Sequence, residues 1–264
     1  MAKKKKIEAL VISQKMLADG ILDMWIATPL AESAKPGQFI GIYPMDMTKL
    51  LPRPISICEV SDEKDALRLV YRISGKGTAE FALYKQGQHV KIIGILGDNG
   101  FPVEASQGKK VLVMGGGIGV PPLLELSKQL NVSGKPESID IVMGYRNNET
   151  FLKEDFEQYG NLHIATEDGS IGTKGNVIDA VKENNIKADV IYACGPMPML
   201  RAIKKYASEN NIKAYISLEE RMACGVGACL GCVCTTTHKD EHSHVNNARI
   251  CTDGPVFDAE SVDI

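Results

Sequence analysis

The chain has 264 residues, of which 44% are hydrophobic and 24% charged, and its formal net charge is −3. This length fits two domains, or two with a short appendage, and the composition excludes a chain that is disordered throughout. The charge gives no basic footprint for nucleic acid. No stretch approaches the roughly 20 apolar residues of a membrane span, and the segment behind the basic run Lys3–Lys6 does not fit a signal peptide. We therefore expect a cytoplasmic protein with a solvated N-terminal lysine run.

The first region, to about residue 103, consists of short strand-like segments separated by glycine and proline. Residues 67–73 alternate between two faces, with Tyr71 on one face and Arg72 on the other, which is the period of a strand. Several short strands at this spacing predict a closed or nearly closed antiparallel β-barrel. The expected strands are 7–14, 21–27, 38–43, 55–60, 67–73 and 89–95.

The second region, about 104–218, alternates apolar strands with helices. Near-continuous apolar strands that alternate with helices predict a doubly wound parallel sheet, so the fold class is β plus α/β. The expected strands are 110–114, 139–143, 162–166, 189–193 and 214–218, and the expected helices are 121–129, 177–183 and 198–208.

The third region, 219–264, has no helical or strand period and carries five of the seven cysteines. Disulfides are disfavoured in a reducing cytosol, where clustered cysteines more often bind metal. Cys224-x4-Cys229-x2-Cys232, followed at a distance by Cys251, is the plant-type spacing for a [2Fe-2S] cluster. Glycines between the first three cysteines allow backbone N–H groups to point at sulfur.

Other readings of these residues stay open. Zinc is the alternative metal, although zinc sites favour paired C-x2-C knuckles and only one such pair is present here. Cys234 can replace Cys232 or Cys251 as a ligand, but the spacing favours a bystander. Cys58 and Cys194 are expected to be buried small hydrophobic residues. The loop histidines are expected to be solvated, with a second metal site as the alternative: His238, His242 and His244.

A glycine-rich turn follows the strand at 111–114 and precedes a helix start at Pro121. Such a turn exposes backbone N–H groups at a helix N-terminus, where a pyrophosphate is bound. Pro122 replaces the last glycine of the usual fingerprint, and the resulting G-x-G-x-x-P resembles the ferredoxin–NADP reductase superfamily. In that superfamily a C-G-P loop lies beside the nicotinamide. The predicted nicotinamide-binding residues are Gly116, Gly117, Gly119, Cys194, Gly195 and Pro196. The turn at 166–170 is equally well a ligand contact or a plain acidic turn.

A flavin motif of the same superfamily resembles Arg53-Pro54-Ile55-Ser56. The resemblance implies that Arg53 neutralises an FAD phosphate and that Ser56 bonds the isoalloxazine edge. Ile55 stands where the motif has an aromatic residue, which removes a stacking partner. Further FAD contacts are implied at Val70, Tyr71, Arg72, Gly77 and Thr78.

The motifs together extend over nearly the whole chain and resemble the dihydroorotate dehydrogenase B family of electron-transfer subunits. The matching segments are 36–39, 53–56, 97–102, 115–122, 168–170, 194–196, 220–225 and 251–257. The resemblance implies an FAD-binding barrel at 1–103, an NAD domain at 104–218 and a [2Fe-2S] segment at 219–264. Asp98 and the extra Cys234 depart from the pattern we expect.

The resemblance also implies a partner, an FMN-containing catalytic subunit that oxidises dihydroorotate in pyrimidine biosynthesis. Electrons would pass from FMN through the cluster and FAD to NAD, in a heterotetramer of two subunit types. No general acid or base is expected in this chain. The alternatives are a flavin subunit of a hydrogenase or sulfur reductase, a free-standing NADH:ferredoxin-type reductase, and a zinc-stabilised binding protein. The choice between NAD and NADP stays open, because Arg146 can accept a 2′-phosphate.

Overall fold

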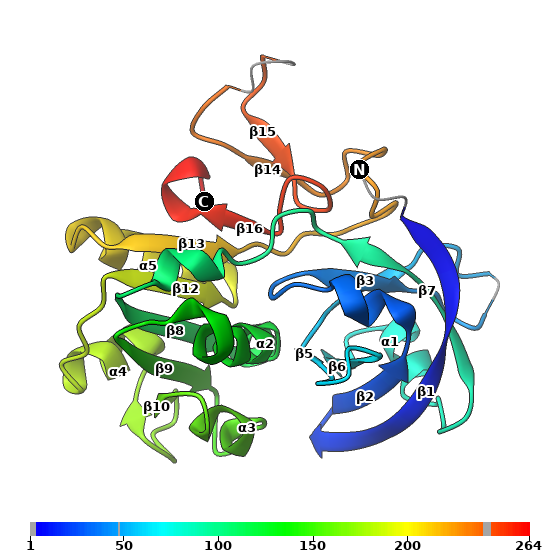
Figure 1. Cartoon of the computed structure of the whole chain (residues 1–264), viewed down its shortest axis with the longest axis horizontal. Coiled ribbons are helices and arrows are strands. Elements are labelled where there is room, and N and C mark those ends of the chain that lie inside the picture. Colours follow the sequence, from blue (N-terminus) through cyan, green and yellow to red (C-terminus); the bar gives the residue numbers. More distant parts are fainter. Residues whose placement is uncertain (1–3, 47, 240–243) are drawn as a thin grey trace.

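The computed structural model describes residues 4–46, 48–239 and 244–264. Its N-terminal part is one antiparallel sheet in the order β4-β3-β7-β1-β2-β6-β5 (Figure 1). The strands are β1 Lys5–Ala18, β2 Ile21–Ala27, β3 Phe39–Ile42, β4 Arg53–Ser56, β5 Glu59–Val60, β6 Ala66–Arg72 and β7 His89–Leu96.

The two edges of this sheet are brought together by the chain itself. β4 and β5 lie at opposite edges, yet only Ile57 and Cys58 separate them in sequence. The amide of Ile57 donates to the Gln38 carbonyl, and the amide of Cys58 donates to the Arg68 carbonyl. The sheet therefore curls into a nearly closed barrel, as predicted. The single strand expected at 55–60 is wrong, because the chain crosses from one edge to the other at this point.

The barrel encloses alternate side chains of its strands. Met24, Ile26, Ile40 and Leu69 are fully buried inside it. One short helix, α1 Lys76–Phe81, packs on the barrel through Phe81, which has no exposed surface. This alternation is the physical reason why the strand pattern could be predicted from the sequence.

The second sheet has the order β11-β10-β9-β8-β12-β13-β16 and is parallel except for its last strand. Its order reverses between β8 and β12, so their carboxyl ends form the switch point at which such sheets bind ligands. The expected parallel sheet is confirmed. Its elements are β8 Lys110–Gly116, α2 Pro122–Gln129, β9 Ser138–Tyr145, α3 Lys153–Glu157, β10 Asn161–Thr166, β11 Thr173–Lys174, α4 Val177–Glu183, β12 Val190–Cys194, α5 Met197–Glu209 and β13 Lys213–Ser217.

The C-terminal segment forms three short strands that have no pattern in the sequence. β14 Val233–Thr235 and β15 Asn247–Arg249 form a hairpin that projects from the body of the molecule in Figure 1. β16 Val256–Asp258 returns to pair with β13 at the edge of the second sheet. Three residues are too few to establish a period of two, so these strands could not be predicted.

Lys5 and Lys6 of the N-terminal run have side chains that face solvent, as expected, while their backbone joins the barrel. Lys3 lies outside the described residues, but Lys5 and Lys6 open β1 and pair with Gly94 and Ile93 of β7. Their side chains remain exposed, and the Lys6 ammonium lies 4.0 Å from the centre of the Tyr43 ring. The backbone of the run is therefore part of the barrel.

A buried ion network ties the barrel to the second sheet. The Arg68 guanidinium on β6 binds both Asp23 carboxylate oxygens, at 3.1 and 3.0 Å, and Glu59 at 3.1 Å. It also contacts Asp155 on α3, at 2.5 Å. Asp23 is 1% exposed and Arg68 is 7% exposed. Because Asp155 belongs to the second sheet's layer, this network links the two parts of the chain.

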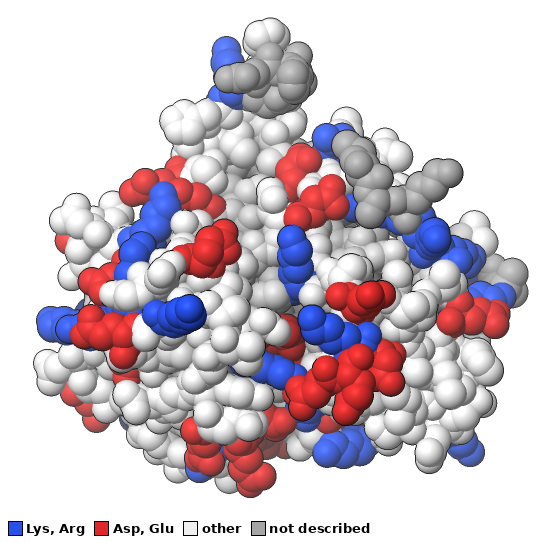
Figure 2. Space-filling view, viewed as in Figure 1, with Lys and Arg blue, Asp and Glu red and all other residues white. Residues whose placement is uncertain are grey.

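The surface carries both signs of charge. Figure 2 shows acidic and basic side chains interspersed over the face in view. This mixture agrees with the near-neutral composition. No helix among the described residues is long and apolar enough to cross a membrane.

Replacing Arg68 with Met should lower the free energy of unfolding by about 3–5 kcal/mol, because the Asp23 carboxylate would stay buried without its partner. Urea unfolding of the full chain measures this change. The control is Lys205→Met, which removes an exposed pair with Glu209 at 3.8 Å and should change stability by less than about 1 kcal/mol. Equal effects of the two substitutions would show that the Arg68 network does not stabilise the fold.

Candidate functional site

Two cavities lie between the barrel and the second sheet, and they meet. The first has a volume of about 640 Å³ and is lined mainly by the barrel. The second has a volume of about 760 Å³ and lies over the carboxyl ends of the parallel strands. Arg72, Ile118 and Glu219 line both cavities. A ligand in one cavity can therefore contact a ligand in the other.

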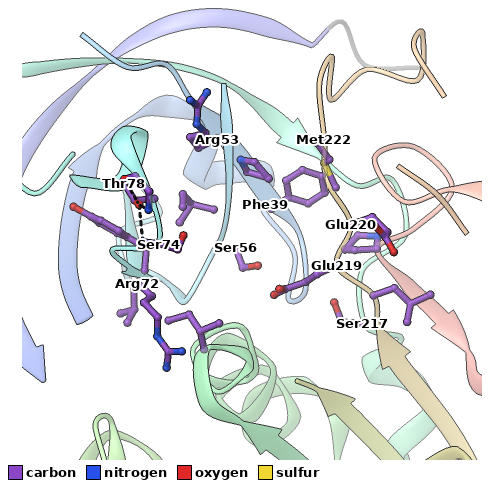
Figure 3. Close-up of a pocket in the computed structure, with 18 of the residues that line it drawn as sticks. Phe39, Arg53, Ser56, Arg72, Ser74, Thr78, Ser217, Glu219, Glu220 and Met222 are labelled. Atoms are coloured by element: carbon purple, nitrogen blue, oxygen red, sulfur yellow. Dashed lines mark hydrogen bonds between the residues drawn. The ribbon is translucent and has the colours of Figure 1, made fainter. Parts of the chain in front are cut away.

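The first cavity collects most of the residues predicted to bind FAD. β4 contributes Arg53, Pro54, Ile55 and Ser56, and β6 with α1 contributes Val70, Tyr71, Arg72 and Thr78. Phe39 and Met222 add apolar wall opposite this group (Figure 3). Arg53, Arg72 and Lys76 supply cations. An elongated cavity with apolar walls and basic groups fits a flavin with a pyrophosphate.

Tyr71 and Arg72 of β6 both line the first cavity, but they differ in their exposure. Tyr71 is 2% exposed, and its hydroxyl donates to the Gln14 side chain at 2.8 Å inside the barrel. Burial raises the Tyr71 pKa above its ordinary value, so the phenol stays neutral. Arg72, one residue later, is exposed and lines both cavities. The sequence period predicted this difference between the two side chains.

The loop before α1 is shaped by Thr78. The Thr78 hydroxyl accepts from the amides of Ser74 and Gly75, at 2.9 and 3.2 Å. It therefore organises the loop in this structure. At Gly77, an added Cβ would lie 2.6 Å from Arg53 Nε. Gly77 thus lets Arg53 pack against α1 at the edge of the cavity.

The second cavity contains the predicted glycine turn at the switch point. Gly116, Gly117 and Gly119 line it, and Gly117 has a φ of +54°. A Cβ at Gly119 would lie 2.5 Å from the Cys194 carbonyl oxygen, so only glycine lets these two loops approach. The exposed amides of such a turn at the start of α2 fit a pyrophosphate.

The second predicted loop lies against this turn. Gly195 and Pro196 line the second cavity. Cys194 lies behind that surface, because its side chain is 1% exposed. Burial raises the pKa of its thiol, so Cys194 is a neutral buried group. Cys58 is also fully buried, as expected.

The four predicted cluster ligands form two pairs of thiols. Cys229 lies close enough to Cys224 to lower the pKa of that thiol, and the Cys251 amide donates to Cys232 Sγ at 3.4 Å. No group of three or more His, Cys, Asp or Glu side chains in the described part of the chain is gathered for one metal ion. A [2Fe-2S] cluster takes four cysteine thiolates over two irons, so two pairs fit it better than one zinc ion.

The loop that carries the first pair presents amides to sulfur. Cys224 Sγ accepts from the amides of Val226 and Ala228, at 3.4 and 3.3 Å. Partial burial opposes ionisation of Cys224, but these donors outweigh it and lower its pKa to about 7. Gly225 and Gly227 have φ of +69° and +83°, which the wrapped loop requires. The chemistry of this loop suits bound thiolates.

The fifth cysteine of the segment and two of its three loop histidines lie within the described residues. Cys234 is on β14, where it pairs with Ala248, and burial raises its pKa. His238 and His244 are exposed, and His242 lies outside the described residues. The reading of Cys234 as a bystander stays a prediction.

Glu219 was not singled out from the sequence. It follows β13 and points into the first cavity from the side opposite Ser56 (Figure 3). Its side chain is open to the cavities, while the surrounding protein raises its pKa above the ordinary value by desolvation. No local motif surrounds it, and only its position after the last parallel strand could have indicated it.

Replacing Arg53 with Met should weaken FAD binding by roughly tenfold to a hundredfold, because a charge-assisted contact to phosphate is lost. Titration of the FAD-free chain with FAD, followed by flavin fluorescence, measures this change. Lys85→Met is the control, since it removes an exposed cation of the same domain. Unchanged FAD affinity in the Arg53 variant would contradict its role.

Replacing Cys232 with Ser should remove the iron–sulfur cluster, whereas Cys234→Ser should retain it, because only Cys232 belongs to a thiol pair. Iron and acid-labile sulfide content, with the visible absorption of anaerobically purified protein, give the answer. The opposite result, with loss in the Cys234 variant alone, would transfer the ligand role to Cys234.

Comparison with known proteins gives two family matches. Residues 219–263 match the iron–sulfur cluster binding domain of dihydroorotate dehydrogenase B. Residues 113–205 match the oxidoreductase NAD-binding domain. These two ranges contain the four thiols and the glycine turn described above.

Curated relatives cover nearly the whole chain. The chain is 42% identical to the dihydroorotate dehydrogenase B (NAD(+)) electron transfer subunit of Lysinibacillus sphaericus, covering 94% of each chain. It is 43% identical to the subunit of that name from Bacillus cereus, covering 96% of each chain. A solved NADH-dependent reduced ferredoxin-NADP oxidoreductase is 30% identical, with a TM-score of 0.84 over 97% of this chain and 89% of that one. With its flavin-type barrel, its glycine turn and its paired thiols, the chain belongs to the family of dihydroorotate dehydrogenase B electron transfer subunits.

Proposed function

We propose that this chain carries electrons from a catalytic dihydroorotate dehydrogenase subunit to NAD, through a [2Fe-2S] cluster and FAD. In this proposal residues 1–103 bind FAD, residues 104–218 bind NAD and residues 219–264 bind the cluster. The pathway served is pyrimidine biosynthesis, and the location is the cytoplasm. The curated relatives carry this activity in their names.

The observation that carries the proposal is that three sites adjoin one another: the cysteine segment, the flavin cavity and the cavity of the glycine turn. Met222 lines the first cavity and lies two residues before Cys224, the first cluster cysteine. Arg72 and Glu219 of the same cavity also line the cavity of the glycine turn. The first cavity therefore borders both the cysteine segment and the cavity of the glycine turn. This arrangement suits a flavin that, when bound, collects single electrons from a cluster and passes a pair as hydride.

The chain's own residues position these groups. Arg53 and Lys76 supply charge for the flavin phosphates, and Ser56 faces the cavity interior. The glycine turn at Gly116–Gly119 offers amides to the dinucleotide phosphates. Hydride transfer needs reacting atoms about 3–3.5 Å apart, so fixed walls between the two cavities favour it.

The substrate chemistry belongs to a partner in this proposal. An electron transfer subunit requires a catalytic partner, which we take to hold FMN and to form a heterotetramer of two plus two subunits. The cluster segment supports this arrangement, because Cys229 is exposed and accessible to a partner.

A second candidate function rests on the solved relative. The 30% identical structure is described as an NADH-dependent reduced ferredoxin-NADP oxidoreductase, in work on flavin-based electron bifurcation. Flavin subunits of hydrogenases and sulfur reductases are the related alternatives. In each of these cases the three adjoining sites would be retained and the partner would differ.

The experiment is anaerobic purification of the chain from its native cells, identification of what co-purifies, and an assay of dihydroorotate-dependent NAD reduction. We expect an FMN-containing partner and activity that requires both subunits. Gel filtration with light scattering tests the two-plus-two stoichiometry. A hydrogenase, sulfur-reductase or ferredoxin-type partner without dihydroorotate activity would contradict the substrate assignment.

A further inference from the structure

The position of the second cavity indicates which way a dinucleotide would lie in it. This cavity meets the flavin cavity at Arg72, Ile118 and Glu219, so the nicotinamide half lies at this end. The turn Gly116–Gly119 lies next along the cavity and offers its amides to the pyrophosphate. The far end, at the carboxyl ends of β9 and β10, is therefore the end for adenosine and its ribose.

Two glutamates and one arginine line this adenosine end: Glu149, Glu167 and Arg146. The Glu167 amide donates to the Tyr145 carbonyl at 3.1 Å, which holds the start of this turn beside the end of β9. The Tyr145 hydroxyl donates to the Phe151 carbonyl at 2.8 Å, and their rings pack edge to face at 5.3 Å. These contacts fix the loop that carries Glu149.

The barrel adds a third carboxylate to the same end. The β1–β2 hairpin lines the cavity through Asp19, whose amide donates to Glu149 Oε1 at 3.4 Å. All three carboxylates and Arg146 are exposed to the cavity or solvent. No ion pair of Arg146 is recorded within the described residues. Carboxylates therefore outnumber the guanidinium where the ribose hydroxyls arrive.

Asp168 behaves differently although it is adjacent to Glu167. Its carboxylate accepts from the Ser170 hydroxyl at 2.7 Å and from the Ser170 amide at 2.9 Å. These hydrogen bonds lower the Asp168 pKa and hold the carboxylate within its own turn. It is absent from the residues lining either described cavity. Of the two acidic residues in this turn, only Glu167 lines the second cavity.

We propose that Glu149 and Glu167 are the residues that make this chain select NAD over NADP. Their carboxylates accept hydrogen bonds from the adenosine ribose hydroxyls, and they repel the dianionic 2′-phosphate of NADP. Arg146 offsets this repulsion only in part, because Asp19 faces the same end. The inference rests on the proposed function to the extent that NAD occupies this cavity. The sequence alone left the choice between NAD and NADP open, because Arg146 can accept a 2′-phosphate, and this proposal makes that choice.

The test uses the full chain loaded with FAD and two nucleotide fragments, 5′-AMP and 2′,5′-ADP, titrated by calorimetry. The variants are Glu167→Gln, the double variant Glu149→Gln/Glu167→Gln, and Asp168→Asn as the matched control. The control removes one charge from the same turn and keeps an oxygen for Ser170. Ferricyanide reduction with NADH and NADPH gives a second readout, and neither measurement needs dihydroorotate or a partner.

We expect the ratio of 2′,5′-ADP to 5′-AMP affinity to rise about tenfold in Glu167→Gln and further in the double variant. Adding Arg146→Gln to the double variant should reverse that gain, because the 2′-phosphate loses its cation. Asp168→Asn should leave the ratio within about twofold of wild type.

Three results would overturn the proposal. One is a double variant whose ratio of 2′,5′-ADP to 5′-AMP affinity equals that of the wild-type chain. Another is an equal shift in Asp168→Asn, which would indicate a general charge effect instead of contact with the ribose. The third is a wild-type chain that binds neither fragment, which would remove NAD from this cavity. Because a failed dihydroorotate assay would leave the fragment ratios intact, the two failures can be told apart.

Discussion

The geometry of the whole site depends on the ion pairs that the Arg68 guanidinium forms with Asp23 and Asp155. The guanidinium binds Asp23 within the barrel through two hydrogen bonds and contacts Asp155 on the helix layer of the second sheet. A planar guanidinium with several fixed donors can hold carboxylates from both parts in one arrangement. The two cavities are shared by residues of both parts, so their junction keeps its shape only while these parts keep their orientation.

The C-terminal segment provides a second connection at the opposite side of the site. The Gly97 amide, just after β7 of the barrel, donates to the carbonyl of Cys251, a proposed cluster ligand, at 3.1 Å. Four residues further on, the Pro255 carbonyl accepts from Leu218, and β16 then joins the second sheet. One short segment thus binds both parts of the molecule and carries Cys251, one of the four proposed cluster ligands. This explains why a region without its own core is ordered in contact with both domains.

The sequence predicted what is encoded by local spacing. The cysteine run and the glycine turn are motifs of a few residues, and the structure brings Cys224 close to Cys229 and Cys232 close to Cys251. The barrel and the parallel sheet followed from periods of two and from strand–helix alternation. Glu219 and Glu149 had no such signal, because their role depends on which segments meet across the cavities. The split of residues 55–60 was missed for a related reason, since a crossing between sheet edges leaves the apolar pattern intact.

The two cavities also differ in charge, and this difference bears on how each ligand is used. Among the described residues, the first cavity is lined by the cations Arg53, Arg72 and Lys76 against two glutamates. The second is lined by Arg72 and Arg146 against four carboxylates. A phosphate-bearing group is therefore held more strongly by charge in the first cavity than in the second. A flavin has to stay bound through many reaction cycles, whereas a nicotinamide dinucleotide has to leave after each one. The excess of carboxylates in the second cavity suits a ligand that must be released, and the backbone amides of the glycine turn still position its phosphates without adding net charge.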